Sequence, residues 1–71
     1  MTDQLTIRVN DETRQVPSPT TLHSLLNELG LAERKGVAVA INDAVVPRKS
    51  WLNHSLENHD RVLVINATQG G

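Results

Sequence analysis

The residues with the clearest potential for chemistry are the last two, Gly70 and Gly71, which follow an apolar run that ends at Ile65. Glycine lacks a Cβ atom, so a Gly-Gly end can lie extended in a channel that is too narrow for other residues. An α-carboxylate is ionised at neutral pH, and it is a poor electrophile until it is activated, most simply as an acyl-phosphate anhydride. The pattern predicts that the Gly71 carboxylate is a substrate of other enzymes. The alternative is that two small terminal residues simply fray.

Composition argues against several classes of function. The 71 residues are enough for one small domain. The chain has no cysteine, so it cannot form a disulfide, a thiolate nucleophile or a cysteine-based zinc site. The chain has seven Lys and Arg and eight Asp and Glu, and its basic residues are scattered along the sequence. This charge distribution argues against nucleic-acid binding. Met1 leads into a polar segment without an apolar secretory stretch, so we expect a cytoplasmic protein without a membrane anchor.

The titratable side chains do not suggest a catalyst. His23, His54 and His59 are not spaced to place two imidazoles on one helix face, so we expect no metal site. Glu57 and Asp60 are not expected to form an acid–base pair, because a domain of this size offers no pocket that would tune a carboxylate. No nucleophile, base or cofactor motif stands out. We therefore expect a protein that is not an enzyme and binds no cofactor.

Apolar periodicity and turn residues predict the order β-β-α-β-β-β, an α+β fold. The last strand is followed by polar residues and the two glycines, so we expect a domain over residues 1–66 and a flexible tail over residues 67–71. The expected elements are strands at 5–9 and 13–16, a helix at 22–29, strands at 37–41 and 44–46, a helical turn or coil at 48–52, and a strand at 61–65.

The predicted helix has clear start and stop signals. Thr20 or Thr21 can cap its N-terminus, and Gly30 can take the left-handed conformation that ends a helix, with Leu31 supplying the apolar contact of such a cap. Its apolar residues recur at i, i+3, i+4 and i+7, and they are Leu22, Leu25, Leu26 and Leu29. This spacing predicts that one face of the helix fills the core.

The strand order predicts a mixed sheet with one helix across a face. A right-handed crossover would place the first and last strands side by side, which is the β-grasp arrangement, with the last strand inside the sheet. The run Val37–Ile41 is apolar without alternation, so we expect an inner strand covered on both faces. Trp51 is expected to close one end of the core. The aliphatic exterior of the sheet is either an interaction surface or plain core packing.

Four segments together resemble one known family. They are Val37–Asp43, Val45–Arg48 followed by Trp51, Asp60–Val62 and Gln69–Gly71. This combination resembles the bacterial thiamin sulfur-carrier family ThiS, which has the ubiquitin-like β-grasp fold, and the similarity covers essentially the whole chain. One departure is that the family usually has Gly-Asp before its last strand.

Here His59 stands where that family usually has glycine. We therefore expect Asn58 or His59 to adopt a positive φ angle, which glycine would adopt more easily.

The resemblance implies a function for the tail. Gly71 would be adenylated by an E1-like enzyme of the ThiF type, with ATP, and then converted to a thiocarboxylate. That sulfur would pass to a thiazole synthase of the ThiG type to form the thiazole of thiamin. Gly70, Gln69 and Thr68 would thread the channels of these partners. Because the chain has no cysteine, the attacking persulfide or thiolate must come from a separate sulfur donor.

Three alternatives remain open from the residues alone. A molybdopterin-synthase-type sulfur carrier shares the fold and the diglycine but tends to have an aromatic-rich last strand, and Arg61–Ile65 has no aromatic residue. A β-grasp module could instead bind partners non-covalently, or a ubiquitin-like modifier could be attached to lysines. Arg48 and Lys49, next to Trp51, are either a partner-facing patch or a solvated rim.

Overall fold

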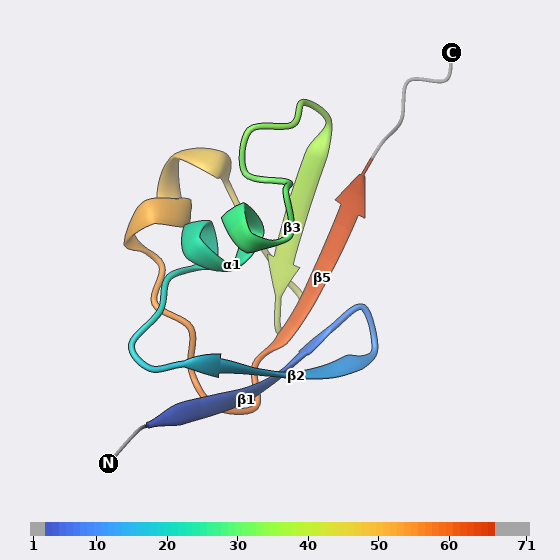
Figure 1. Ribbon diagram of the computed structural model, residues 1–71. Helices are drawn as coiled ribbons and strands as arrows, with labels where there is room; N and C mark the ends of the chain where they lie inside the picture. Colours follow the sequence, from blue (N-terminus) through green and yellow to red (C-terminus); the bar gives the residue numbers. More distant parts are fainter. Residues whose placement is uncertain (1–2, 67–71) are drawn as a thin grey trace.

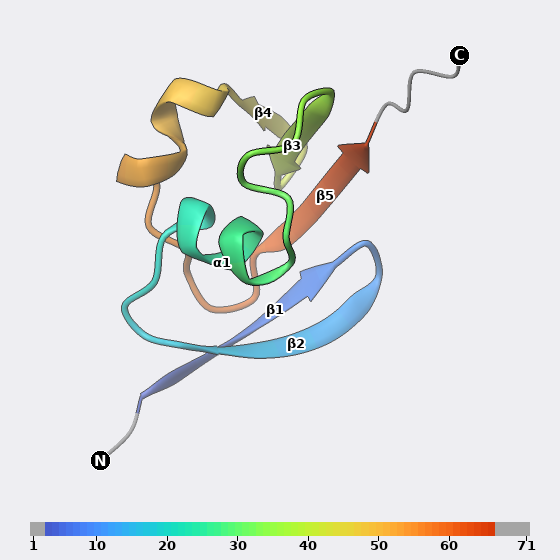
Figure 2. The same ribbon diagram turned by 45° about the horizontal axis from the view of Figure 1, so that its top comes forward.

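The computed structural model describes residues 3–66, which form a five-stranded sheet and one α-helix (Figures 1 and 2). The predicted order is confirmed, and the helical turn expected near residues 48–52 is a 3-10 helix. The predicted tail, residues 67–71, lies outside the described residues. The elements are β1 (Gln4–Val9), β2 (Glu12–Pro17), α1 (Leu22–Glu28), β3 (Val37–Ile41), β4 (Ala44–Val46), the 3-10 helix η1 (Arg48–Asn53) and β5 (Arg61–Asn66).

The two hairpins of the sheet have the same turn chemistry. Asn10 and Asp11 connect β1 to β2, and Asn42 and Asp43 connect β3 to β4. All four residues have positive φ, at 50° and 73° in the first turn and 52° and 73° in the second. Two-residue turns with positive φ at both positions match the right-handed twist of the strands, and Asn and Asp tolerate this conformation. The Asn-Asp pairs therefore fix the register of both hairpins.

Helix α1 has the predicted caps. The second of the two candidate threonines is the N-cap, because the Thr21 hydroxyl oxygen accepts the backbone N–H of Ser24 at 3.1 Å. At the other end Gly30 has φ of 76°, and the N–H of Leu31 donates to the carbonyl of Leu26 at 2.8 Å. This is the Schellman arrangement, in which a left-handed residue turns the chain back over the last helical turn.

The sheet order is β2-β1-β5-β3-β4, so β5 is the central strand. It pairs parallel with β1, Val9 opposite Val62, and antiparallel with β3, Val39 opposite Val64. The crossover through α1 thus places the first and last strands side by side, as predicted, and the β-grasp arrangement is confirmed (Figure 1). A strand paired on both sides is a rigid support for whatever follows it in the chain.

The core lies between one face of the sheet and the two helices, α1 and η1, which pack against each other (Figure 2). Trp51 is only 1% exposed, and its indole Nε1–H donates to the carbonyl of Val46 at 3.0 Å. The prediction that Trp51 closes the core is confirmed. The buried apolar residues are Ile7, Val9, Val16, Leu22, Leu25, Leu26, Ala32, Val39, Ile41, Val46, Trp51, Leu56 and Val62.

The expectation that Val37–Ile41 is covered on both faces is wrong. Val39 and Ile41 are buried against the helices. Ala38, the second residue of β3, is exposed on the opposite face of the sheet. Within residues 3–66 no element covers that face, which we call the open face. Alanine is compatible with both situations because its side chain is small, so an unbroken apolar run did not reveal that one side of the strand is exposed.

Candidate functional site

The four residues predicted to carry the chemistry lie outside the described residues: Thr68, Gln69, Gly70 and Gly71. The described part of the candidate site is the strand that leads to them. β5 ends at Asn66, and Gly71 follows five positions later in the sequence. The contacts that hold β5 therefore decide how firmly the base of this segment is fixed.

Asn10 holds β5 from the side of the first hairpin. Its side-chain Nδ2 donates to the carbonyl of Val64 at 3.2 Å, and its Oδ1 accepts the N–H of Val64 at 2.8 Å. Its backbone N–H also donates to the carbonyl of Val62 at 2.9 Å. The Asn10 side-chain amide thus makes the two hydrogen bonds to the Val64 backbone that a further residue of β1 would make. It therefore continues the hydrogen bonding along β5 past Val9, the last residue of β1.

Asn42 holds β5 at its other end, from the turn of the second hairpin. Its Oδ1 accepts the backbone N–H of Arg61 at 3.0 Å, and its Nδ2 donates to Oδ1 of Asp60 at 2.9 Å. Asp60 is 8% exposed and is the one buried charged residue among residues 3–66. Its second oxygen accepts the backbone N–H of Glu57 at 2.8 Å. The buried carboxylate is thus paired with donors from two segments, as burial of a charged group requires.

The turn before β5 has the strained residue that the sequence predicted. His59 has φ of 71°, in the left-handed region. Its backbone N–H donates to the carbonyl of Thr6 at 2.6 Å, and the N–H of Thr6 donates to Oδ1 of Asn58 at 2.7 Å. These two bonds tie the turn to β1, so the surrounding contacts hold His59 in a conformation that costs a residue other than glycine about 1–2 kcal/mol.

Arg48 is used inside the chain. Its guanidinium lies 4.5 Å from the centre of the Trp51 ring, and its two terminal nitrogens donate to the carbonyls of Ala32 and Arg34 at 2.6 and 2.5 Å. These contacts hold the loop between α1 and β3 against η1. A role for Lys49 and Arg48 in binding a partner stays a prediction, and the contacts of Arg48 are those of a residue that positions a loop.

The open face carries a continuous patch of apolar side chains. Ala40 of β3 lies opposite Leu63 of β5 on one side and Val45 of β4 on the other, and Ala38 lies opposite Ile65. The larger side chains are well exposed, at 50% for Leu63, 52% for Ile65 and 76% for Val45. We call these five residues the aliphatic strip. It follows β5 toward Asn66, the last described residue.

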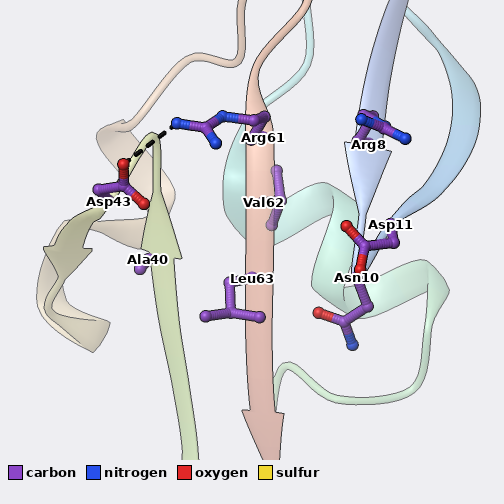
Figure 3. A pocket seen from close by; sticks show the side chains of 8 residues that line it. All are labelled: Arg8, Asn10, Asp11, Ala40, Asp43, Arg61, Val62 and Leu63. Atoms are coloured by element: carbon purple, nitrogen blue, oxygen red, sulfur yellow. Dashed lines mark hydrogen bonds and ion pairs between the residues drawn. The ribbon is translucent and has the colours of Figure 1, made fainter.

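A shallow hollow of about 390 Å³ lies at the end of the strip that is farther from Asn66. Its lining includes Arg61 and Leu63 of β5 and Arg8 of the neighbouring β1, as Figure 3 shows. The two arginines are register neighbours on parallel strands. Arg61 reaches Asp43 at 3.1 Å, in an ion pair whose side chains are 61% and 85% exposed. Such an exposed pair contributes at most about 1 kcal/mol, so it leaves Arg61 available to another carboxylate.

The structure adds two negative findings about other candidates. No group of three or more His, Cys, Asp or Glu within residues 3–66 is placed to hold a metal ion. In the same range no helix is long and apolar enough to cross a membrane.

Sequence reasoning missed the two asparagine contacts to β5. The signal was present as two Asn-Asp pairs, at residues 10–11 and 42–43, each between two strands. The turns follow from this signal, but the partners of the side chains lie 54 positions away for Asn10 and 18 to 19 positions away for Asn42. Such contacts depend on the order of strands in the sheet and cannot be read from local sequence.

Comparison with known proteins places this arrangement in a family. The family model described as "ThiS family" matches residues 4–71. The chain is 35% identical over 65 residues to the sulfur carrier protein ThiS of Escherichia coli (strain K12), covering 92% of this chain and 97% of that protein.

Solved structures agree on the fold. The crystal structure of the thiamine biosynthesis protein ThiS from Geobacter metallireducens has a TM-score of 0.77 at 23% identity, covering 94% of this chain and 100% of that one. The solution structure of a thiamine biosynthesis protein from the same organism has the same TM-score and identity, covering 94% of this chain and 88% of that one. The family match over nearly the whole chain and the 35% identity to a relative that is almost completely covered show that this chain belongs to the ThiS family.

Proposed function

We propose that this protein is a sulfur carrier in thiamin biosynthesis and that the carboxylate of Gly71 carries the sulfur atom. The carrier is a substrate of partner enzymes and not itself a catalyst. Membership of the ThiS family supports this proposal, as does the E. coli relative, whose name is sulfur carrier protein.

The observation that carries the proposal is the position of β5. This strand is central in the sheet, and asparagine side chains hold it at both ends. Gly71 is the fifth residue after the end of β5, and an extended chain spans at most about 3.6 Å per residue. A partner can therefore take Gly71 into an active site up to about 18 Å from the folded domain. A rigid base and a short reach suit a carrier whose reactive group works inside other proteins.

The chemistry requires two partners and a donor. An adenylating enzyme of the ThiF type would let the Gly71 carboxylate attack the α-phosphate of ATP, forming an acyl adenylate and releasing pyrophosphate. This chain has no cysteine of its own, so the sulfur must come from a separate donor. A persulfide of that donor would attack the acyl carbon and displace AMP, forming an acyl disulfide. A thiol would then reduce the acyl disulfide, which releases the thiocarboxylate and leaves the donor sulfur in a disulfide with that thiol. A thiazole synthase of the ThiG type would take the sulfur.

Deletion of Gly71 tests the assignment of the reactive residue. We expect the shortened chain to unfold at the same denaturant concentration as the full chain, because Gly71 follows the last strand, and to support no growth without thiamin in cells that depend on this protein. The matched control is the full chain expressed at the same level. Growth of cells that contain only the shortened chain would contradict the proposal.

Replacement of Gly70 by valine tests the narrow channel. We expect Gly70→Val to leave the unfolding transition unchanged but to slow adenylation at least about tenfold, since a Cβ and two methyl groups must fit where glycine passes. ATP–pyrophosphate exchange with the adenylating enzyme measures this step. Gln69→Ala is the control one position earlier, and equal rates for both variants would show that the channel accepts branched side chains.

A further inference from the structure

Strand β5 is supported differently along its two edges. On the β3 edge the pairing continues to the last residue of the strand, because Asn66 lies opposite Val37. On the β1 edge the pairing ends at Val62, which lies opposite Val9. The residues Leu63–Asn66, which lead to the proposed reactive segment, therefore extend past the end of β1.

Asn10, the first residue after β1, lies beside β5 (Figure 3). Its side chain bonds to both the N–H and the carbonyl of Val64, at 2.8 and 3.2 Å. The turn requires a positive φ at Asn10, and glycine or aspartate would satisfy this requirement as well. Glycine has no side chain, however, and an aspartate has no N–H to donate to the Val64 carbonyl. Of these three residues that suit the turn, only asparagine can therefore bond to both groups.

The two bonds limit the length of chain that separates the sheet from Gly71. Without them, Val64–Asn66 would be held by β3 alone, as an edge strand is. Gly71 is the fifth residue after Asn66 and the eighth after Leu63, so release of these three residues would lengthen the connection from five residues to eight. The effective concentration of a tethered group falls with about the −3/2 power of the tether length, which gives a decrease of about twofold.

We propose that Asn10 is a positioning residue for the adenylation of Gly71. By holding Val64, it sets the point and the direction in which residues 67–71 leave the sheet, and it thereby raises the fraction of docked carriers whose carboxylate reaches ATP. Asn10 acts through β5 and does not touch the reacting atoms. The inference rests on the proposed function as a sulfur carrier.

The kinetic test is ATP–pyrophosphate exchange with the purified adenylating enzyme and the variant Asn10→Gly, which keeps the positive φ of the turn. We expect kcat to fall at least about twofold while the KM for the carrier stays the same, because the change affects the placement of the carboxylate and not the docking of the domain. A KM that rises with kcat unchanged would show that Asn10 contacts the enzyme directly and would overturn the proposal.

Thr21→Ala is the matched control for stability. It removes the N-cap of α1, whose hydroxyl accepts the Ser24 N–H at 3.1 Å, and it should destabilise the domain about as much as Asn10→Gly does. Because Thr21 makes no bond to β5 within residues 3–66, this variant should keep the kcat of the unaltered protein. Equal losses of kcat in the two variants would assign the effect to stability and would contradict the positioning role.

Amide hydrogen exchange supplies a second readout, which does not need the enzyme. In Asn10→Gly we expect exchange at Ile65 and Asn66 to become at least severalfold faster, while exchange at Trp51 in η1 changes no more than in Thr21→Ala. Unchanged exchange at Ile65 would show that β3 alone holds the end of β5, and the proposal would then be wrong.

The outcomes separate the two levels of the argument. If the unaltered protein supports no exchange of pyrophosphate, the proposed function and the positioning role both fail. If it supports exchange and Asn10→Gly has the same kcat, the positioning role alone is wrong. Urea unfolding checks that each variant folds. If Asn10→Gly does not fold, Asn10→Asp replaces it, because aspartate also suits the turn and lacks the donor to the Val64 carbonyl.

Discussion

Replacement of Asn42 by glycine should destabilise the domain strongly, because Asn42 supports both the buried Asp60 and the start of β5. Glycine keeps the positive φ of the turn, so the change removes the side-chain bonds without adding backbone strain. The bond to the Asp60 carboxylate is a charged one, and losing such a bond costs about 1.5–3 kcal/mol. The exposed bond to the Arg61 N–H adds about 0.5–1 kcal/mol. The relaxed backbone of glycine offsets part of this, so we expect a loss of about 2–3 kcal/mol.

Asn10→Gly is the matched control, because Asn10 occupies the same position of the same kind of turn. Its side-chain bonds go to the uncharged, exposed backbone of Val64, so we expect a loss of only about 1 kcal/mol. Urea unfolding followed by circular dichroism measures both. A domain of this size is stable by roughly 4–10 kcal/mol, so the difference between the variants is well within reach of the method.

With an m-value of about 1 kcal/mol/M, the urea midpoint should fall by about 2–3 M for Asn42→Gly and by about 1 M for Asn10→Gly. An equal or smaller loss for Asn42→Gly would refute the reasoning, because it would mean that the buried Asp60 does not depend on the Asn42 amide.

Two further predictions concern the contacts around η1. Trp51→Phe should lower the free energy of unfolding by about 2–3 kcal/mol, because the Val46 carbonyl loses its indole donor and the smaller ring leaves a cavity. Thermal unfolding measures this change, and an unchanged Tm would contradict the prediction. Arg48→Ala should destabilise the domain by about 1–2 kcal/mol through loss of the bonds to two carbonyls and the ring contact, while leaving the KM of ATP–pyrophosphate exchange unchanged. A KM that rises without loss of stability would show instead that Arg48 contacts the enzyme.

Local signals in the sequence were sufficient for the helix and the turns. The leucine spacing, a threonine at the start and Gly30 at the end predict α1 and both of its caps, because each cap depends on residues within a few positions. The Asn-Asp pairs predict the hairpins for the same reason. The departure from Gly-Asp at His59 predicts the positive φ found there, since the chain must turn at that point whichever residue occupies it.

The features that depend on the third dimension could not be predicted in the same way. The apolar run Val37–Ile41 indicated a strand covered on both faces, but alanine can be exposed at little cost, and Ala38 is exposed. Arg48 was expected to face a partner or solvent, and its bonds to Ala32 and Arg34 depend on how the preceding loop folds back. The aliphatic strip exists only because β3, β4 and β5 lie next to one another.

The most direct test of the sulfur-carrier proposal is the mass of the carrier after reaction with ATP, the adenylating enzyme and a sulfur donor. Replacement of a carboxylate oxygen by sulfur increases the mass of the protein by nearly the same amount as oxidation of Met1, so fragmentation must show which residue carries the increase. We predict a mass increase equal to the difference between sulfur and oxygen, located at Gly71 and dependent on ATP. A Gly71 of unchanged mass under conditions in which the enzyme modifies another carrier would contradict the proposal.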